Sequence, residues 1–338
     1  MRPIILTWLL IAFALSPNVS AQETTNWQTF DEYNSRYPGT HALALYLDSE
    51  GLLWIGTRGT GVVSYNDQVW KNYTQQSGLA DNVVHAIAQD SKGMWFGTKN
   101  NGVSFYDGQT WRSYQSDSGL ANNFVRAIAI EREKVWFATA AGVSLLDTRE
   151  NKWSKYTTRG EYELIVGEWQ LKRPYAIIEG LPLNEIWDLK LTANGELWIG
   201  TYNGLAKFNN VNWNSYRPPE YPMSDNEIKC LAVDSDGGLW VGTHTGGLIY
   251  FLNDEWTTYS LEDGLAHSEV TAITITTNSV WVGTNGGGIS RFDKKNSWTN
   301  YTTKDGLSSN FVASLTSSGS RIWAGFYGPG ISRFEEEQ

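Results

Sequence analysis

Cysteine is nearly absent from this chain of 338 residues, in which Cys230 is the only thiol. A single cysteine excludes an intrachain disulfide, so the fold has to be held together by packing alone. Histidine is scarce as well, with four residues, and no two of them stand at the H-x-H or H-x-x-x-H spacing typical of metal sites. We therefore expect neither a metal nor another cofactor.

Long apolar runs are missing beyond the N-terminus. The chain begins with the basic Arg2, an apolar run over residues 4–15 and small residues at 19–21. This pattern predicts a signal peptide over residues 1–21, because the apolar run is too short for a permanent membrane span. No later segment is apolar enough to cross a membrane. We expect an exported protein, periplasmic or extracellular, without a membrane span.

Basic residues are outnumbered, with 26 Lys and Arg against 36 Asp and Glu. Loss of residues 1–21 would remove Arg2 and leave a formal charge of −11. An acidic protein is a poor partner for nucleic acid or for an anionic membrane surface. Aromatic residues, in contrast, are plentiful: 17 Trp and 17 Tyr can supply the packing that disulfides do not.

A hairpin word, "L-W-x-G-T" followed by a glycine-rich turn, is repeated along the whole chain. Its tryptophans are Trp54, Trp95, Trp136, Trp198, Trp240, Trp281 and Trp323, with spacings of 41, 41, 62, 42, 41 and 42. The chain therefore consists of seven units of about 42 residues, one of which carries some 20 more.

Each unit has the pattern of four short strands, as in "NVVHAIAQD", "GMWFGT", "GVSFYDG" and "TWRSY" of the second. Small sheets with two apolar faces bury both by stacking radially around an axis. The seventh unit lacks its "W-x-x-Y" strand, and an unattached copy, "NWQTF", stands at residues 26–30. The sequence thus predicts an all-β fold over residues 22–338: a single seven-bladed β-propeller of four-stranded antiparallel blades, whose N-terminal strand completes the last blade and closes the ring.

The word "L-W-x-G-T-x-x-G-[GV]-[VLI]", followed by "W-x-x-Y" and a "[SED]-G-L-x-x-N" linker, resembles the two-component regulator propeller repeat. The resemblance covers all seven units. Members of that family form the extracytoplasmic sensors of bacterial hybrid two-component systems, many of them linked to polysaccharide sensing. It implies a sensor-like, non-catalytic propeller, here expected as a free-standing, exported and monomeric copy.

Several repeated residues are best explained by architecture. A Trp at the same strand position in every unit is expected in the core between blades. The "DSxG" words at Asp48, Asp90 and Asp234 predict hairpin turns and lack the further ligands that calcium needs. A polar column, mostly Asn, is expected to cap the turn into each inner strand, with a polar collar at the channel mouth as the alternative. Cys230 falls in a column of small residues, so we expect a buried, inert thiol.

Two columns differ from unit to unit while their neighbours do not. One follows the "G-T" word and the other lies near the start of the innermost strand; alternating strand direction places both on one face. We predict that ligand-binding residues come from these columns: Arg58, Lys99, Tyr202, His244, Asn285 and Tyr327, with His85, Arg126, Trp187 and Lys229.

The chemistry of this set suggests the ligand. Cations and interleaved aromatic side chains suit an anionic oligosaccharide, although a neutral carbohydrate, another small molecule or a peptide also fits. The insertion at residues 158–181, between units three and four, has an alternating pattern that predicts an extra hairpin, and its length suggests a lid. The competing interpretation is that the columns are drifted surface residues and the insertion a decoration.

Two other functions remain open. All four histidines (His41, His85, His244, His267) fall on the predicted face, where Glu185, Glu227 and Glu269 begin neighbouring inner strands. Propeller lyases that open lactone rings, such as streptogramin B lyase, use rim His and Glu residues with a divalent metal, so a metal-assisted lyase or hydrolase is an alternative. A protein-interaction scaffold, with a signalling partner docked on the rim, is the other.

Overall fold

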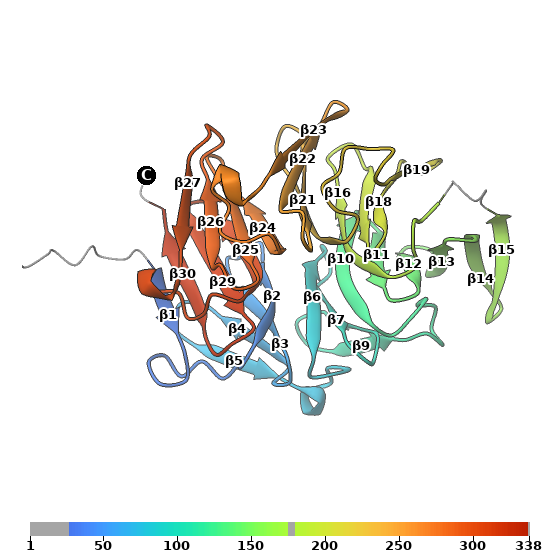
Figure 1. Ribbon diagram of the computed structural model, residues 1–338. Helices are drawn as coiled ribbons and strands as arrows, with labels where there is room; N and C mark the ends of the chain where they lie inside the picture. The colour runs from blue at the N-terminus through green and yellow to red at the C-terminus, as the bar shows by residue number, and fades with distance from the viewer. Residues whose placement is uncertain (1–26, 175–179, 337–338) are drawn as a thin grey trace, which may run out of the picture.

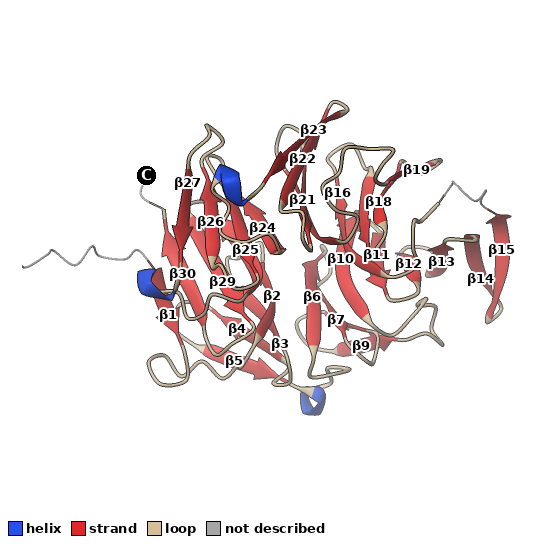
Figure 2. Ribbon diagram, viewed as in Figure 1, coloured by secondary structure: helices blue, strands red, loops and turns tan. Residues whose placement is uncertain are grey.

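The computed structural model describes residues 27–174 and 180–336, and the predicted signal peptide lies outside them. These residues form seven small antiparallel sheets arranged around one axis (Figure 1). Strands account for nearly all of the regular structure, and the helices are three single 3₁₀ turns, η1 (Gln75–Ser77), η2 (Leu261–Asp263) and η3 (Thr303–Asp305) (Figure 2). The seven-bladed propeller predicted from the repeats is confirmed.

The sheets follow the repeat, each beginning at the axis and running outward. Blade 1 consists of β2 (Ala42–Leu47), β3 (Leu53–Thr57), β4 (Val62–Tyr65) and β5 (Trp70–Tyr73). Blade 2 consists of β6 (Val84–Gln89), β7 (Met94–Thr98), β8 (Val103–Tyr106) and β9 (Trp111–Tyr114). Blade 3 consists of β10 (Val125–Glu131), β11 (Lys134–Thr139), β12 (Gly142–Asp147) and β13 (Lys152–Thr157), extended by β14 (Gly160–Ile165) and β15 (Glu168–Pro174).

The second half of the ring repeats this order. Blade 4 consists of β16 (Ile186–Leu191), β17 (Leu197–Thr201), β18 (Gly204–Phe208) and β19 (Trp213–Tyr216). Blade 5 consists of β20 (Ile228–Val233), β21 (Leu239–Thr243), β22 (Leu248–Leu252) and β23 (Glu255–Tyr259). Blade 6 consists of β24 (Val270–Ile275), β25 (Val280–Thr284), β26 (Ile289–Phe292) and β27 (Trp298–Tyr301). Blade 7 consists of β28 (Val312–Ser318), β29 (Arg321–Phe326), β30 (Ile331–Glu335) and β1 (Trp27–Phe30).

The two ends of the described chain meet in blade 7. Strand β1 pairs antiparallel with β30, with Trp27 opposite Phe334 and Phe30 opposite Ile331. Trp27 and Phe30 are both buried, and the innermost strand of blade 7 contacts that of blade 1 as well as that of blade 6. The predicted closure of the ring by the N-terminal strand is therefore confirmed.

The repeated tryptophans form the core between blades, as expected, and each is at most 5% exposed. In three blades the indole N–H also donates to the turn aspartate; the distances to Asp48, Asp90 and Asp234 are 2.8, 2.8 and 3.1 Å. The other carboxylate oxygen of each aspartate accepts backbone N–H groups of its own turn. These aspartates therefore shape hairpins, as predicted, and their oxygens are occupied.

Four residues of the polar column hold the linkers between blades. The side-chain oxygens of Asn82, Asn123 and Asn310 accept the backbone N–H seven residues earlier at 2.8–2.9 Å. Asn184 accepts from Thr158 in the same way at 2.7 Å, across 26 residues. The expected cap of the residue's own turn is therefore wrong at these positions, because the bond reaches back to the preceding linker; the turn itself is capped by the residue before the column, as in the bonds of Asp81 to Val83 and Asn122 to Phe124.

The insertion forms the expected hairpin, in which β14 pairs with β15. It does not form the lid that its length suggested. Strand β14 also pairs with β13, so the hairpin extends the outer edge of blade 3 to six strands, and it lies at the periphery of the propeller (Figure 1). Leu164 and Trp169 pack against the core around Trp153, which keeps the apolar face of the hairpin on the blade.

Candidate functional site

The two variable columns meet on one face of the propeller, which we call the mouth face. In six blades the residue after the "G-T" position donates its backbone N–H to the start of the innermost strand; examples are Arg58 to His41, Lys99 to Val83 and His244 to Glu227, each at 3.0–3.1 Å. These bonds fix the loop between the second and third strands beside the channel. The sequence argument therefore placed both columns correctly on the same face.

A cavity of about 620 Å³ follows the axis below this face. Six of the ten predicted residues line it: His85, Arg126, Trp187, Lys229, Asn285 and Tyr327. The other four, Arg58, Lys99, Tyr202 and His244, are not among its lining residues. The lining also contains a set of apolar side chains from the innermost strands: Leu45, Ile87, Ile128, Leu231, Ile273 and Leu315. This apolar part of the wall is interrupted on blade 4 by the ion pair of Asp188 with Lys190.

Cations and aromatic rings alternate along the side of the mouth formed by blades 3 to 5. We call this set the cation–aromatic stack: Phe124, Arg126, Trp187, Lys229 and Tyr202. The Arg126 guanidinium lies 4.4 Å from the ring centre of Phe124 and 4.6 Å from that of Trp187. The Lys229 ammonium lies 4.3 Å from Trp187 and 5.5 Å from Tyr202. Trp187 is therefore held between two cations, a favourable arrangement for its π faces.

Both cations of the stack already have an acidic partner. Arg126 Nη2 lies 2.8 Å from Glu185 Oε1, and Lys229 Nζ lies 2.8 Å from Glu227 Oε1. Arg126 Nη1 also donates to the carbonyl of Ile186 at 3.0 Å. The charge of the stack is thus balanced within the protein, and the ion pairs hold the aromatic rings in place. From the sequence, these glutamates were expected only as acid–base candidates, and Phe124 was not among the predicted site residues.

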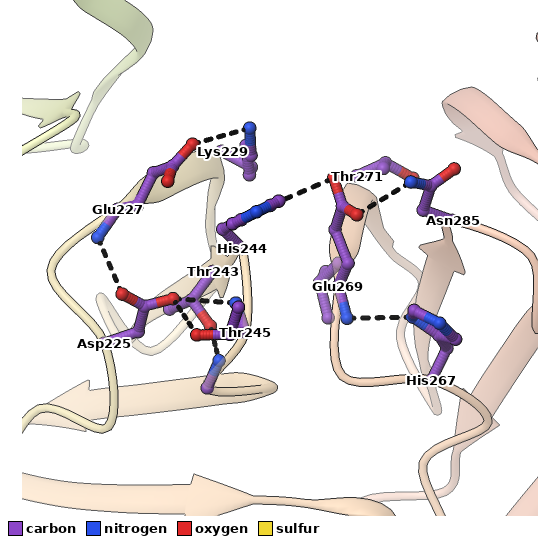
Figure 3. Close-up of polar contacts among 12 residues, drawn as sticks. Asp225, Glu227, Lys229, Thr243, His244, Thr245, His267, Glu269, Thr271 and Asn285 are labelled. Atoms are coloured by element: carbon purple, nitrogen blue, oxygen red, sulfur yellow. Dashed lines mark hydrogen bonds and ion pairs between the residues drawn. The ribbon is translucent and has the colours of Figure 1, made fainter.

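On blades 5 and 6, His244 and Asn285 both contact one carboxylate (Figure 3). Glu269 Oε2 accepts a hydrogen bond from Asn285 Nδ2 at 2.7 Å. Its Oε1 lies 3.3 Å from His244 Nδ1, and the two atoms do not form a hydrogen bond. The backbone N–H of Glu269 donates to His267 Nδ1 at 3.0 Å, so that His267 caps the turn into β24.

His85, on blade 2, is an uncharged residue among cations. Burial, followed by the charges of Arg126, Lys99 and Arg58, lowers its pKa to about 4, against a smaller opposing effect of Asp81. Its ring packs on Phe124 at 5.1 Å between ring centres. His85 is therefore neutral at pH 7.

The structure gives little support to metal or thiol chemistry at the mouth. Among the described residues, no group of three or more His, Cys, Asp or Glu side chains could hold a metal ion. Of the three glutamates considered as histidine partners, Glu269 is the one whose carboxylate lies within 4 Å of a histidine ring nitrogen in the described part of the chain. Burial raises the pKa of the Cys230 thiol far above its usual value, which makes it an inert core residue, as predicted.

The closed ring of seven sheets defines the fold class as a seven-bladed β-propeller with a variable mouth face. Four segments, residues 36–59, 78–100, 180–203 and 222–245, match the family model described as two component regulator propeller. Together with the seven repeats, these matches show that the chain belongs to the two-component regulator propeller family. No curated protein matches the sequence.

Solved structures with a similar fold include the extracellular domains of two putative hybrid two component systems from B. thetaiotaomicron. One matches with 22% identity and a TM-score of 0.70 over 88% of this chain, and the other with 19% and 0.71 over 92%. This chain spans 40% of the length of each of them. A catalytically inactive variant of virginiamycin B lyase from Staphylococcus aureus with quinupristin matches with 17% identity and a TM-score of 0.67, covering 92% of this chain and 99% of that one. At these identities the likeness shows the fold.

Proposed function

We propose that this protein is an exported, non-catalytic sensor-type propeller that binds a carbohydrate at its mouth. The observation that carries the proposal is the cation–aromatic stack beside an open cavity. Aromatic rings suit the apolar faces of sugars, and N–H donors suit sugar hydroxyl oxygens. The likeness to extracellular domains of two-component systems supports the sensor role and the exported location. No helix of the described residues is long and apolar enough to cross a membrane.

Unused donors at the mouth support a ligand rich in acceptors. At the mouth, two buried N–H groups have no hydrogen-bond partner among the described residues: Trp187 Nε1 and Arg126 Nε. Leaving a buried donor unpaired costs about 1–3 kcal/mol, so a ligand oxygen that reaches one of them gains that amount. Sugar hydroxyls and peptide carbonyls can both do so, and the binding measurement below distinguishes a sugar from a peptide.

Binding to a glycan array and to a peptide library, followed by calorimetry of the hits, tests the proposal. Trp187→Ala should weaken binding at least tenfold, or by about 1.4 kcal/mol, because the centre of the stack is lost. Trp256→Ala is the matched control, since Trp256 is a half-buried tryptophan on the outer strand β23. Equal affinities of the two variants would contradict a binding site at the mouth.

A metal-assisted lyase at the same mouth is the second candidate. The contact of His244 with Glu269 favours it, as does the likeness of the fold to virginiamycin B lyase. The reaction would require turnover of a cyclic lactone that depends on a divalent metal and is lost in His244→Ala. We expect no such turnover, and its detection would replace the binding proposal by the enzymatic one.

A further inference from the structure

We propose that the acidic group of an anionic sugar binds at the mouth over blades 1 and 2, between Arg58 and Lys99, while a sugar ring lies on the exposed aromatic pair of blade 7. This inference rests on the proposed carbohydrate-binding function and specifies its ligand. It also assigns the stack on blades 3 to 5 to positioning and ring contact, since its cations are already neutralised.

The first step is the difference between paired and free cations. Arg126 and Lys229 each lie 2.8 Å from a glutamate oxygen, so an acidic ligand would have to compete with a built-in carboxylate. Arg58 and Lys99 are exposed, and in the described part of the chain neither side chain makes an ion pair or hydrogen bond. Of the four Lys and Arg side chains predicted at the mouth, Arg58 and Lys99 over blades 1 and 2 are therefore the ones whose charge is available to a ligand.

The second step is the rigidity of these two loops. Arg58 forms a β-bridge with Val83 at the beginning of the neighbouring blade, and the N–H of Lys99 donates to the carbonyl of that same Val83 at 3.0 Å. Both cations are thus anchored on opposite sides of one residue, and His85 follows two positions later. Their effect on the pKa of His85 shows that their charges reach this position. A fixed pair of cations recognises an anion at little cost in ordering.

The third step is the aromatic pair beside them. Phe311 and Tyr327 of blade 7 are 52% and 46% exposed, and the N–H of Tyr327 donates to the carbonyl of Phe311 at 2.9 Å. Burial raises the pKa of Tyr327, Glu269 raises it further, and Arg58 lowers it. Arg58 therefore lies within electrostatic reach of the Tyr327 hydroxyl. Exposed rings within reach of the free Arg58 are complementary to a sugar that carries a carboxylate or a sulfate.

An anion in this place would also change the protonation of His85. The groups that act on it are the cations Arg126, Lys99 and Arg58 and the carboxylate of Asp81. A ligand charge between Lys99 and Arg58 offsets their repulsion of a proton, so the pKa of His85 rises in the complex. Binding then takes up protons, and affinity should increase as the pH falls from 7.5 to 5.

Calorimetry on the whole chain tests the inference with three trisaccharides: one of galacturonic acid, one sulfated, and one neutral. The double variant Arg58→Gln with Lys99→Gln should weaken binding of an acidic trisaccharide at least tenfold and leave that of the neutral one within twofold. The two acidic probes distinguish a carboxylate from a sulfate ligand. The increase of affinity at low pH should be lost in His85→Gln.

The control is the double variant Lys71→Gln with Arg112→Gln, which changes the net charge equally on exposed outer strands of the same two blades. It should bind both acidic probes within twofold of the wild type. Equal losses in the two double variants, or an equal loss for the neutral sugar, would overturn the inference. If the acidic probes no longer bind Trp187→Ala but still bind the double variant Arg58→Gln with Lys99→Gln, the inference is overturned while the proposed function stands. Failure of every saccharide to bind the wild type would overturn the proposed function with it.

Discussion

Removing one side chain of the N-terminal strand tests how much that strand contributes to the closed ring. Trp27 is 6% exposed and wedged between blades, with ring centres 6.1 Å from Trp281, 5.8 Å from Tyr301 and 5.2 Å from Phe334. Truncating a buried tryptophan to alanine costs about 3–5 kcal/mol, a large part of the about 5–15 kcal/mol that stabilises a typical domain. We therefore expect Trp27→Ala to lower the free energy of unfolding by about 3–5 kcal/mol.

Urea unfolding followed by far-ultraviolet circular dichroism measures this loss, because tryptophan fluorescence would average 17 indoles. Trp27→Phe should cost less than half as much, since the ring contacts remain and the indole N–H has no hydrogen-bond partner among the described residues. Tyr33→Ala, at a side chain that is 88% exposed, is the control and should stay within about 0.5 kcal/mol of the wild type. If Trp27→Ala were as stable as this control, the N-terminal strand would not contribute to closure.

Three further predictions concern the hairpin, His85 and Asp188. Deleting residues 159–177 returns Thr158 and Asn184 to the seven-residue spacing of the other linkers, so the propeller should stay folded with ligand binding unchanged. The free energy of unfolding should fall by about 1–3 kcal/mol, because the packing of Leu164 and Trp169 is lost. An unfolded product by circular dichroism would contradict this prediction. His85 is harder to protonate in the folded state, where its pKa is about 4, than in the unfolded state, where it is about 6.5. Its titration should therefore lower the free energy of unfolding as the pH falls from 6.5 to 4. The difference between the urea midpoints at pH 7 and pH 4.5 should be smaller in His85→Gln than in the wild type. The Asp188 carboxylate accepts a hydrogen bond from the N–H of Leu231 at 2.8 Å and forms an ion pair with Lys190 at 3.0 Å. Asp188→Ala should therefore lower the free energy of unfolding by about 1–3 kcal/mol. Asp188→Asn keeps an acceptor and should lower it less, and urea unfolding of both variants measures the difference.

The fold could be predicted from the sequence because each repeat is a complete structural unit. The spacing of the "W-x-G-T" word gives the number of blades directly, and the missing last strand of the seventh unit identifies the partner of residues 27–30. The blades themselves require no knowledge of long-range contacts beyond stacking of equal neighbours. This is why the ring and its closure were confirmed together.

The candidate site was only partly accessible in this way. Variation among equivalent positions located the mouth columns, but it could not show which cations are free. The pair of Arg126 with Glu185 joins residues 59 positions apart in different blades, and repeat alignment contains no information on such pairs. The pair of Glu227 with Lys229 was within reach, since residues two apart on a strand face the same side.

The lid expectation was wrong for a related reason. Alternation predicts two strands in the insertion, but it does not say which sheet edge they join. The insertion begins directly after β13, the outermost of the four repeat strands of blade 3. The unpaired N–H and C=O groups at the edge of β13 are the nearest hydrogen-bond partners for β14. A segment that starts at an outer strand therefore pairs with that strand and stays at the periphery, away from the axis.

The hydrogen bond of the Thr158 N–H to the Asn184 side chain holds the two ends of the linker together whatever segment lies between them. The same bond at Asn82, Asn123 and Asn310 marks three more places where extra chain could be spliced in. Each would add its strands to the circumference, so new docking surfaces could evolve or be engineered there while the central opening keeps its shape. The propeller thus separates its central opening from an outer circumference that is free to acquire new contacts.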